Sequence, residues 1–331
     1  MNGLGRRQAI AGAIGTAGLL PRSGWALPAS PGPLSSPVTL RLGGSVVPHV
    51  APFHYIAAEL KPLGVEVELI KFTRYADVRT ALASGSIDLG SIGPADVPIA
   101  LSQGLKSVVA LMGVGVSPKN PIAKTGLELA KWPDLVGKNI GIAPGSAVWF
   151  QFAATIVEAG LPYSKLTTLN MQGAGTVMVQ AMQRGDIDVF IGWEPFESMA
   201  IDQKLATRIG ALDYSTSRAV GAELGLVGVN RSFLDSRREA VKRFLWAYLT
   251  IQDRLMASKE ALAKGVSEYT GLTPEVAHNV AATMTLGQFL TLDQMQRQAA
   301  AFYSLGVLTK DVSGELGPYF EGQLVAQVLA G

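Results

Sequence analysis

The chain has 331 residues, of which 48 % are hydrophobic and 16 % charged, so it is long enough for two domains and too apolar for a disordered protein. The formal charge is +2, but residues 1–26 carry three arginines and no acidic residue; the remainder has 25 basic and 26 acidic residues, which argues against a nucleic-acid partner. Cysteine is absent, which excludes disulfides, thiolate metal sites, a catalytic thiol and lipid attachment at a signal-peptide cysteine.

The beginning of the chain has the pattern of an export signal. Arg6-Arg7 precedes a Gly- and Ala-rich apolar stretch at residues 9–20, and Gly24-Trp25-Ala26 is a suitable cleavage site. A membrane anchor would need about 20 apolar residues, which this stretch does not supply. We therefore predict a signal peptide of the twin-arginine type at 1–26, an unlipidated protein in the periplasm, and a flexible leader at 27–37, where five residues are Pro or Gly.

Beyond the leader, hydrophobic patterning predicts strands and helices that alternate, which is typical of an α/β fold. The first unit has predicted strands at 38–42, 65–70, 87–92 and 108–114, and predicted helices at 51–60, 76–83 and 95–103. The second unit has predicted strands at 139–143, 168–171 and 187–191, predicted helices at 147–159 and 176–183, and a strand at 222–229 that leads back to the first unit. The rest is predicted to be helical, at 237–257, from 273, and at 291–306.

One segment of the chain occurs twice. Residues 81–89 (ALASGSIDL) return as residues 181–189 (AMQRGDIDV), 100 positions later. Each copy reads as a helix end, a glycine, a short strand and a loop with proline, and Asp88 and Asp188 are expected to hold the shared turn. Two copies at this distance indicate two similar lobes rather than a solenoid, and a cleft between lobes is a usual place for a small ligand.

Ligands of open α/β sheets lie beyond the carboxyl ends of the strands. The loops at those ends supply the candidate ligand-binding residues, which are Ser45 and Val46, then Gly93, Pro94, Ala95 and Asp96, then Gly145, Ser146 and Ala147, and finally Trp193 and Glu194.

Gly145-Ser146-Ala147 opens a predicted helix, where free backbone N–H groups and the helix dipole favour an anion. Gly93-Pro94-Ala95 can do the same from the other lobe. The alternative is that Ser146 only caps its helix and that Gly93 is only a turn residue.

The remaining candidates also have two interpretations each. Trp193 is either a buried wall or a ring packed on the ligand, and Glu194 either accepts a hydrogen bond from an amine or ring N–H of the ligand or forms an ion pair or cap. His49 and His54 are too few for a metal site without cysteine or an acidic cluster, so surface or capping roles are expected, with a place in the cleft as the alternative. No metal or cofactor is predicted.

The order of these features resembles the substrate-binding proteins of ABC importers, in the sulfonate, nitrate and taurine group. The resemblance is carried by residues 64–68, 81–93, 132–138, 144–147, 185–188 and 193–196. It implies the type II periplasmic binding protein fold, with two α/β lobes, a hinge of two crossings near 117–121 and 215–221, and C-terminal helices. Lobe 1 would be 38–117 plus 221–331, and lobe 2 would be 118–220.

The resemblance also implies a function. The protein would close two lobes over a small organic solute, an alkanesulfonate or taurine-like compound, and deliver it as a monomer to an ABC permease. Alternatives are a binder of nitrate, bicarbonate or a pyrimidine such as a thiamine precursor, and a sensory module that presents its ligand to a receptor. An exported enzyme is disfavoured, because the chain has no cysteine, H-E-x-x-H, G-x-S-x-G or P-loop motif.

Overall fold

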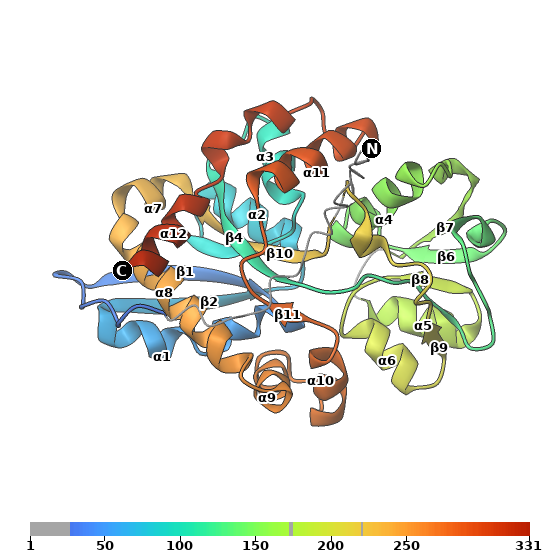
Figure 1. Cartoon of the computed structure of the whole chain (residues 1–331), viewed down its shortest axis with the longest axis horizontal. Helices are drawn as coiled ribbons and strands as arrows, with labels where there is room; N and C mark the ends of the chain where they lie inside the picture. The colour runs from blue at the N-terminus through green and yellow to red at the C-terminus, as the bar shows by residue number, and fades with distance from the viewer. Residues whose placement is uncertain (1–26, 172–174, 220) are drawn as a thin grey trace, which may run out of the picture.

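The computed structural model describes residues 27–171, 175–219 and 221–331, so the predicted signal peptide at 1–26 lies outside the described residues. The described chain forms two mixed β-sheets that lie at opposite ends of the long axis, as Figure 1 shows. Within these ranges no helix is both long enough and apolar enough to cross a membrane.

The first sheet has six strands in the order β11-β4-β10-β3-β1-β2. They are β1 (Val38–Ser45), β2 (Val65–Phe72), β3 (Leu89–Ile92), β4 (Val108–Val116), β10 (Glu223–Asn230) and β11 (Thr285–Leu286). β1 pairs in parallel with β2 and β3, whereas β10 lies antiparallel between β3 and β4. This sheet is therefore assembled from two separate stretches of the chain.

The second sheet has five strands in the order β7-β6-β8-β5-β9. They are β5 (Ile122–Lys124), β6 (Asn139–Ile142), β7 (Thr167–Asn170), β8 (Val189–Ile191) and β9 (Ala206–Arg208). The chain enters this sheet between β4 and β5 and leaves it between β9 and β10, so two segments join the sheets. The predicted lobe limits at 117 and 221 stay a prediction.

Helices cover both faces of each sheet. Alternate side chains of a strand point to opposite faces, so a strand that is apolar throughout needs helices packed on both of them. In the first sheet, Val109 and Leu111 of β4 belong to the core cluster that contains residues of α8 (Arg238–Leu255), whereas Ala110 belongs to the cluster that contains residues of α11 (Leu292–Ser304). The helices are α1 (Ile56–Leu60), α2 (Tyr75–Ser84), α3 (Asp96–Ser102), α4 (Ala147–Glu158), α5 (Thr176–Arg184), α6 (Phe196–Asp202), α7 (Arg231–Ser236), α8 (Arg238–Leu255), α9 (Lys259–Thr270), α10 (Pro274–Ala281), α11 (Leu292–Ser304) and α12 (Gly322–Ala330).

The sequence repeat corresponds to a structural repeat. Helices α2 and α5 each end at a glycine, Gly85 with φ 74° and Gly185 with φ 81°, in the left-handed region that glycine enters without steric cost. Each glycine N–H donates to the carbonyls of the last turn of its helix. The chain is thereby turned into β3 in one lobe and β8 in the other.

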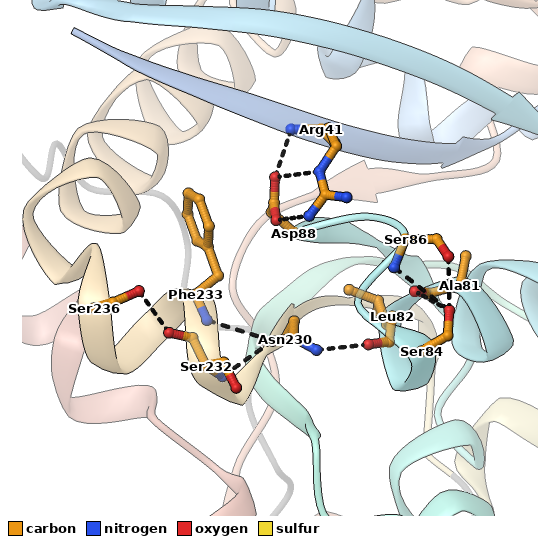
Figure 2. Close-up of polar contacts among 10 residues, drawn as sticks. All are labelled: Arg41, Ala81, Leu82, Ser84, Ser86, Asp88, Asn230, Ser232, Phe233 and Ser236. Atoms are coloured by element: carbon orange, nitrogen blue, oxygen red, sulfur yellow. Dashed lines mark hydrogen bonds and ion pairs between the residues drawn. The ribbon is translucent and has the colours of Figure 1, made fainter.

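The two repeated aspartates fasten these turns to a neighbouring strand, β1 in the first lobe and β6 in the second. The Asp88 carboxylate accepts the backbone N–H of Arg41 at 2.8 Å, and the Asp188 carboxylate accepts that of Asn139 at 2.9 Å. Figure 2 shows that Asp88 also binds the Arg41 guanidinium and that Asn230 bridges to the end of α2. The predicted structural role of the repeat is observed in both lobes.

Some predicted elements differ from the structure. The helix expected at 51–60 is divided into a 3₁₀ helix, η1 (Pro48–His54), and α1; Pro52, which has no N–H to donate, lies inside η1. The helix expected at 237–257 is preceded by α7, and α8 begins only after Arg237, whose φ of −133° is not helical. The predicted strand at 87–92 begins at Leu89.

The segment predicted to be a flexible leader lies against α8 and the first lobe. The carbonyl of Pro28 accepts from Trp246 Nε1 at 3.1 Å, and that of Gly32 accepts from Arg243 Nε at 2.9 Å. The N–H of Leu34 donates to the carbonyl of Leu63 at 2.9 Å. These hydrogen bonds hold residues 27–37 more closely than a flexible leader would be held.

Candidate ligand-binding site

A cleft of about 200 Å³ lies between the two sheets. It is lined by residues that follow β1, β3, β6 and β8 and by residues of both segments that join the sheets. The carboxyl ends of the strands therefore face the cleft from both sides, as expected for ligand sites of open α/β sheets.

Most of the predicted site residues line this cleft. They are Ser45, Gly93, Ala95, Asp96, Gly145, Ser146, Ala147, Trp193 and Glu194. The other two, Val46 and Pro94, are not among the lining residues, and the side chain of Val46 is exposed. Contact between any of these residues and a ligand stays a prediction.

The amino end of α4 faces the cleft. Ser146 is its N-cap, and its Oγ accepts the N–H of Trp149 at 3.1 Å, so the capping interpretation of Ser146 is observed. The first-turn N–H groups of a helix have no carbonyl partner inside the helix, and the dipole makes this end positive. This end of the cleft therefore favours an acceptor group on a ligand.

The corresponding loop of the first lobe is different. The N–H of Gly93 donates to Asp96 Oδ2 at 2.6 Å, and Asp96 is also paired with Arg79. Burial raises the pKa of Asp96, while Arg79 opposes this shift. A carboxylate of the protein thus occupies the place where an anion was expected. Gly93 permits a close approach of the lobes instead, since a Cβ there would lie 3.2 Å from that of Ala147.

Ser45 presents a buried hydroxyl at the end of β1. Its N–H donates to Ser91 Oγ at 2.9 Å and its carbonyl accepts from the Tyr269 hydroxyl at 3.0 Å, so its backbone is fixed. Its Oγ has no hydrogen-bond partner among the described residues, although the residue is only 1 % exposed. Buried polar groups rarely lack a partner, so this hydroxyl is an exception at the edge of the cleft.

Both carboxylate oxygens of Glu194 accept hydrogen bonds from the protein. Its Oε1 accepts from Arg208 Nη2 at 2.9 Å and its Oε2 accepts the N–H of Ser198 at 3.0 Å, so both the ion-pair and the cap interpretations are observed. Arg208 also donates from Nη1 to Glu197 Oε2 at 2.9 Å. Burial and the neighbouring Glu194 raise the pKa of Glu197 to about 7. Two carboxylates and one guanidinium thus form one wall of the cleft.

Trp193 lies beside Glu194 in this wall of the cleft. Its ring is half-buried and meets Phe196 edge to face at a centroid distance of 6.0 Å. It packs against core clusters of both lobes while lining the cleft. Of the two interpretations of Trp193, the one in which the ring is a wall of the cleft agrees with its contacts in the structure.

Sequence analysis missed several polar residues and aromatic rings of the cleft. They are Arg74, Tyr75, Lys119, Gln151, Glu197, Arg208 and Tyr214. Two signals were available: Glu197 follows Glu194 by one helical turn, and Lys119 lies in the predicted first crossing.

The surface role expected for His49 is wrong, since the residue is buried and its Nε2 is hydrogen-bonded to the hydroxyl of Tyr75. His49 lines the cleft, which was the alternative. Burial and the charge of Lys119 lower the pKa of His49 to about 3. His54 is exposed. Over the residues that the structure describes, no group of three His, Asp or Glu side chains is placed to hold a metal ion.

Two α/β lobes, two connecting segments and a cleft at the strand ends are the architecture of the type II periplasmic binding proteins. The chain superposes on an alkanesulfonate-binding protein from Xanthomonas axonopodis pv. citri bound to MOPS, with a TM-score of 0.72 and 20 % identity over 87 % of this chain and 99 % of that one. A periplasmic nitrate-binding protein from Synechocystis PCC 6803 gives a TM-score of 0.72 with 16 % identity, covering 89 % of each chain. The predicted fold class is confirmed.

The sequence identifies the family. Residues 55–261 match the model of the NMT1/THI5-like family, so the chain belongs to that family. A taurine-binding periplasmic protein of Escherichia coli (strain K12) is 27 % identical over 210 residues, 62 % of either chain. The chain spans about three fifths of the length of the curated relatives it matches.

Proposed function

We propose that this protein is the solute-binding component of an ABC importer, and that it captures an alkanesulfonate or taurine-like compound between its lobes. The observation that carries the proposal is the cleft itself, which is lined from both lobes and from both connecting segments. A solute bound there touches every part that must move when the lobes close, so binding and closure are linked.

The size and chemistry of the cleft support a small solute. Its volume of about 200 Å³ is below the roughly 300–1,000 Å³ of pockets that hold drug-sized ligands. The amino end of α4 favours a group with acceptor oxygens, such as a sulfonate. The proteins that this chain resembles in sequence and structure include binders of taurine and an alkanesulfonate.

The cellular setting is part of the same proposal. Residues 1–26 would direct export by the twin-arginine route, and the mature, unlipidated protein would act in the periplasm as a monomer that docks on a permease. The protein would bind its solute without transforming it, in line with the relatives, which carry the names of binding proteins.

A thermal-shift screen tests the function. The panel contains taurine, alkane- and arylsulfonates, nitrate, bicarbonate and pyrimidines. A ligand present at about 100 times its dissociation constant stabilises the protein by about 2.7 kcal/mol, which raises the melting temperature measurably. A shift with sulfonates or taurine is the expected result. A shift only with nitrate, bicarbonate or a pyrimidine would replace the proposed solute, and no shift with any compound would contradict the proposal.

A further inference from the structure

Lys119 lies in the segment that joins β4 to β5, and it is both buried and part of the cleft lining. Its Nζ donates to the carbonyl of Gly221 at 3.0 Å and to that of Glu223 at 2.6 Å, on the segment by which the chain returns to the first sheet. An ammonium has three N–H donors, and these bonds use two of them.

The backbone of Lys119 is held as firmly as its side chain. Its N–H donates to Asp213 Oδ1 at 3.2 Å and its carbonyl accepts the N–H of Tyr214 at 2.8 Å. One residue is thereby attached to both ends of the returning segment. The ammonium is pre-organised at the cleft, so little conformational entropy is lost when it binds a solute.

Lys119 differs from the other cations of the cleft in its partners. Arg74 is paired with Asp77, and Arg208 with Glu194 and Glu197. No carboxylate oxygen lies within 4 Å of the Lys119 ammonium among the described residues; its hydrogen bonds go to neutral carbonyls. Its charge is therefore balanced only by more distant carboxylates, those of Glu223 and Asp213, and not by an ion pair.

We propose that Lys119 is the specificity-determining cation of the cleft and binds the anionic group of the solute through its ammonium. This inference rests on the proposed function, since it assigns a charge to the solute and a residue to its recognition. Gln151 Nε2 of α4 donates to the carbonyl of Glu223 at 3.3 Å, the same carbonyl that Lys119 binds, so the amino-terminal half of α4 and the ammonium meet at one place.

The electrostatic surroundings add a pH dependence. Burial lowers the pKa of Lys119 to about 7, and Glu223 and Asp213 oppose that shift. His49, whose pKa is about 3, remains neutral near pH 7. An anion bound to Lys119 raises the pKa of the ammonium, so binding takes up a proton above pH 7. Affinity for the anion then decreases by up to tenfold for each pH unit above that value.

The first experiment compares Lys119→Met with Lys61→Met, which removes an exposed lysine on η2 (Lys61–Leu63) of the first lobe. Calorimetric titration at pH 6.5 uses taurine and ethanesulfonate as probes. Loss of a charge-assisted hydrogen bond weakens binding by about tenfold or more, so K119M should show that loss and K61M should bind like the parent protein. Equal affinity of K119M and the parent would overturn the inference and leave the proposed function intact.

The second experiment measures proton uptake on binding at pH 7.5, from titrations in buffers of different ionisation enthalpy. Glu197 also has a pKa of about 7, so the parent is compared with both K119R and E197Q. Arginine keeps the charge but cannot lose its proton, and K119R should therefore bind the probe without proton uptake. E197Q should retain the uptake. Uptake that persists in K119R, or a parent protein that binds neutral solutes but no anion of the panel, would overturn the inference.

Discussion

The pair of glutamates around Arg208 makes the stability of the protein depend on pH. The folded-state pKa of Glu197 is about 7, above its ordinary value of 4.5, so the folded protein binds a proton more tightly there than the unfolded chain. The contribution of Glu197 to the free energy of unfolding is therefore full below about pH 4.5 and is lost as the pH rises through about 7, a change of the order of 3 kcal/mol.

Replacing Glu197 with glutamine removes this titration and keeps an oxygen acceptor for Arg208. We expect E197Q to gain stability relative to the parent as the pH rises from 5 to 8, measured by urea unfolding at each pH. Glu66→Gln, at an exposed position of β2, is the matched control and should run parallel to the parent. An E197Q curve parallel to the parent would show that the Glu197 pKa is not raised.

The residues of this wall show why only part of the site can be predicted from the sequence. Trp193 and Glu194 follow a recognisable strand, so their place in the cleft was predictable. Arg208 lies on β9, a strand of only three residues, and its role depends on two carboxylates that precede it by 11 and 14 positions. Such a pairing is a tertiary contact, and neither the periodicity of hydrophobic residues nor the spacing of the charged ones predicts it.

At the scale of elements, the repeated turn provides an internal comparison. Asp88 is 5 % exposed and accepts the backbone N–H, Nε and Nη2 of Arg41, whereas Asp188 accepts the N–H of Asn139. Hydrogen bonds to charged groups contribute about 1.5–3 kcal/mol, and removing Asp88 leaves three donors without an acceptor. We therefore expect D88A to lose more of its free energy of unfolding than D188A, in urea titrations under identical conditions. A loss in D188A that equals or exceeds that of D88A would contradict this assignment.

Long elements with a clear hydrophobic periodicity were predictable from the sequence, and very short strands were not. The long helix α4 and strands β2 and β10 have clear periodicity and were predicted within two residues of their observed ends, whereas β1 continues three residues beyond the predicted 38–42. β5, β9 and β11 have two or three residues each, too few to show a period, and they exist because a neighbouring strand offers hydrogen bonds.

At the scale of the whole molecule, the two lobes are joined by core residues at the margin of the cleft, one of which, Phe150, also lines it. Phe150 of α4 is 5 % exposed and belongs to a core cluster made otherwise of first-lobe residues, where its ring lies 5.3 Å from that of Phe302 on α11. On the other side of the cleft, α6 contacts α10. Figure 1 shows α4 and α11 facing each other across the junction. These contacts join the two lobes, and we expect opening of the lobes to separate them.

Phe150 should therefore set the balance between open and closed lobes. Burying a phenylalanine side chain stabilises the closed arrangement by about 1.5–3 kcal/mol, so Phe150→Ala should shift the equilibrium toward the open arrangement by roughly 10- to 150-fold. We expect the ligand-free F150A protein to have a larger radius of gyration than the parent in small-angle X-ray scattering. Its affinity for the solute should also be lower, because closure then opposes binding and because Phe150 itself lines the cleft; the radius of gyration is therefore the measurement that reports on closure.

Phe152→Leu separates this effect from a loss of fold stability. Phe152 lies on the same helix but packs in the core of the second lobe, against Trp132 and against Tyr214 of the returning segment, so its truncation weakens that lobe and leaves the Phe150–Phe302 contact in place. F152L should melt at a lower temperature and keep the radius of gyration of the parent. If F150A also keeps that radius and the affinity of the parent, the Phe150–Phe302 contact does not control closure, and the hinge segments around Lys119 would have to do so.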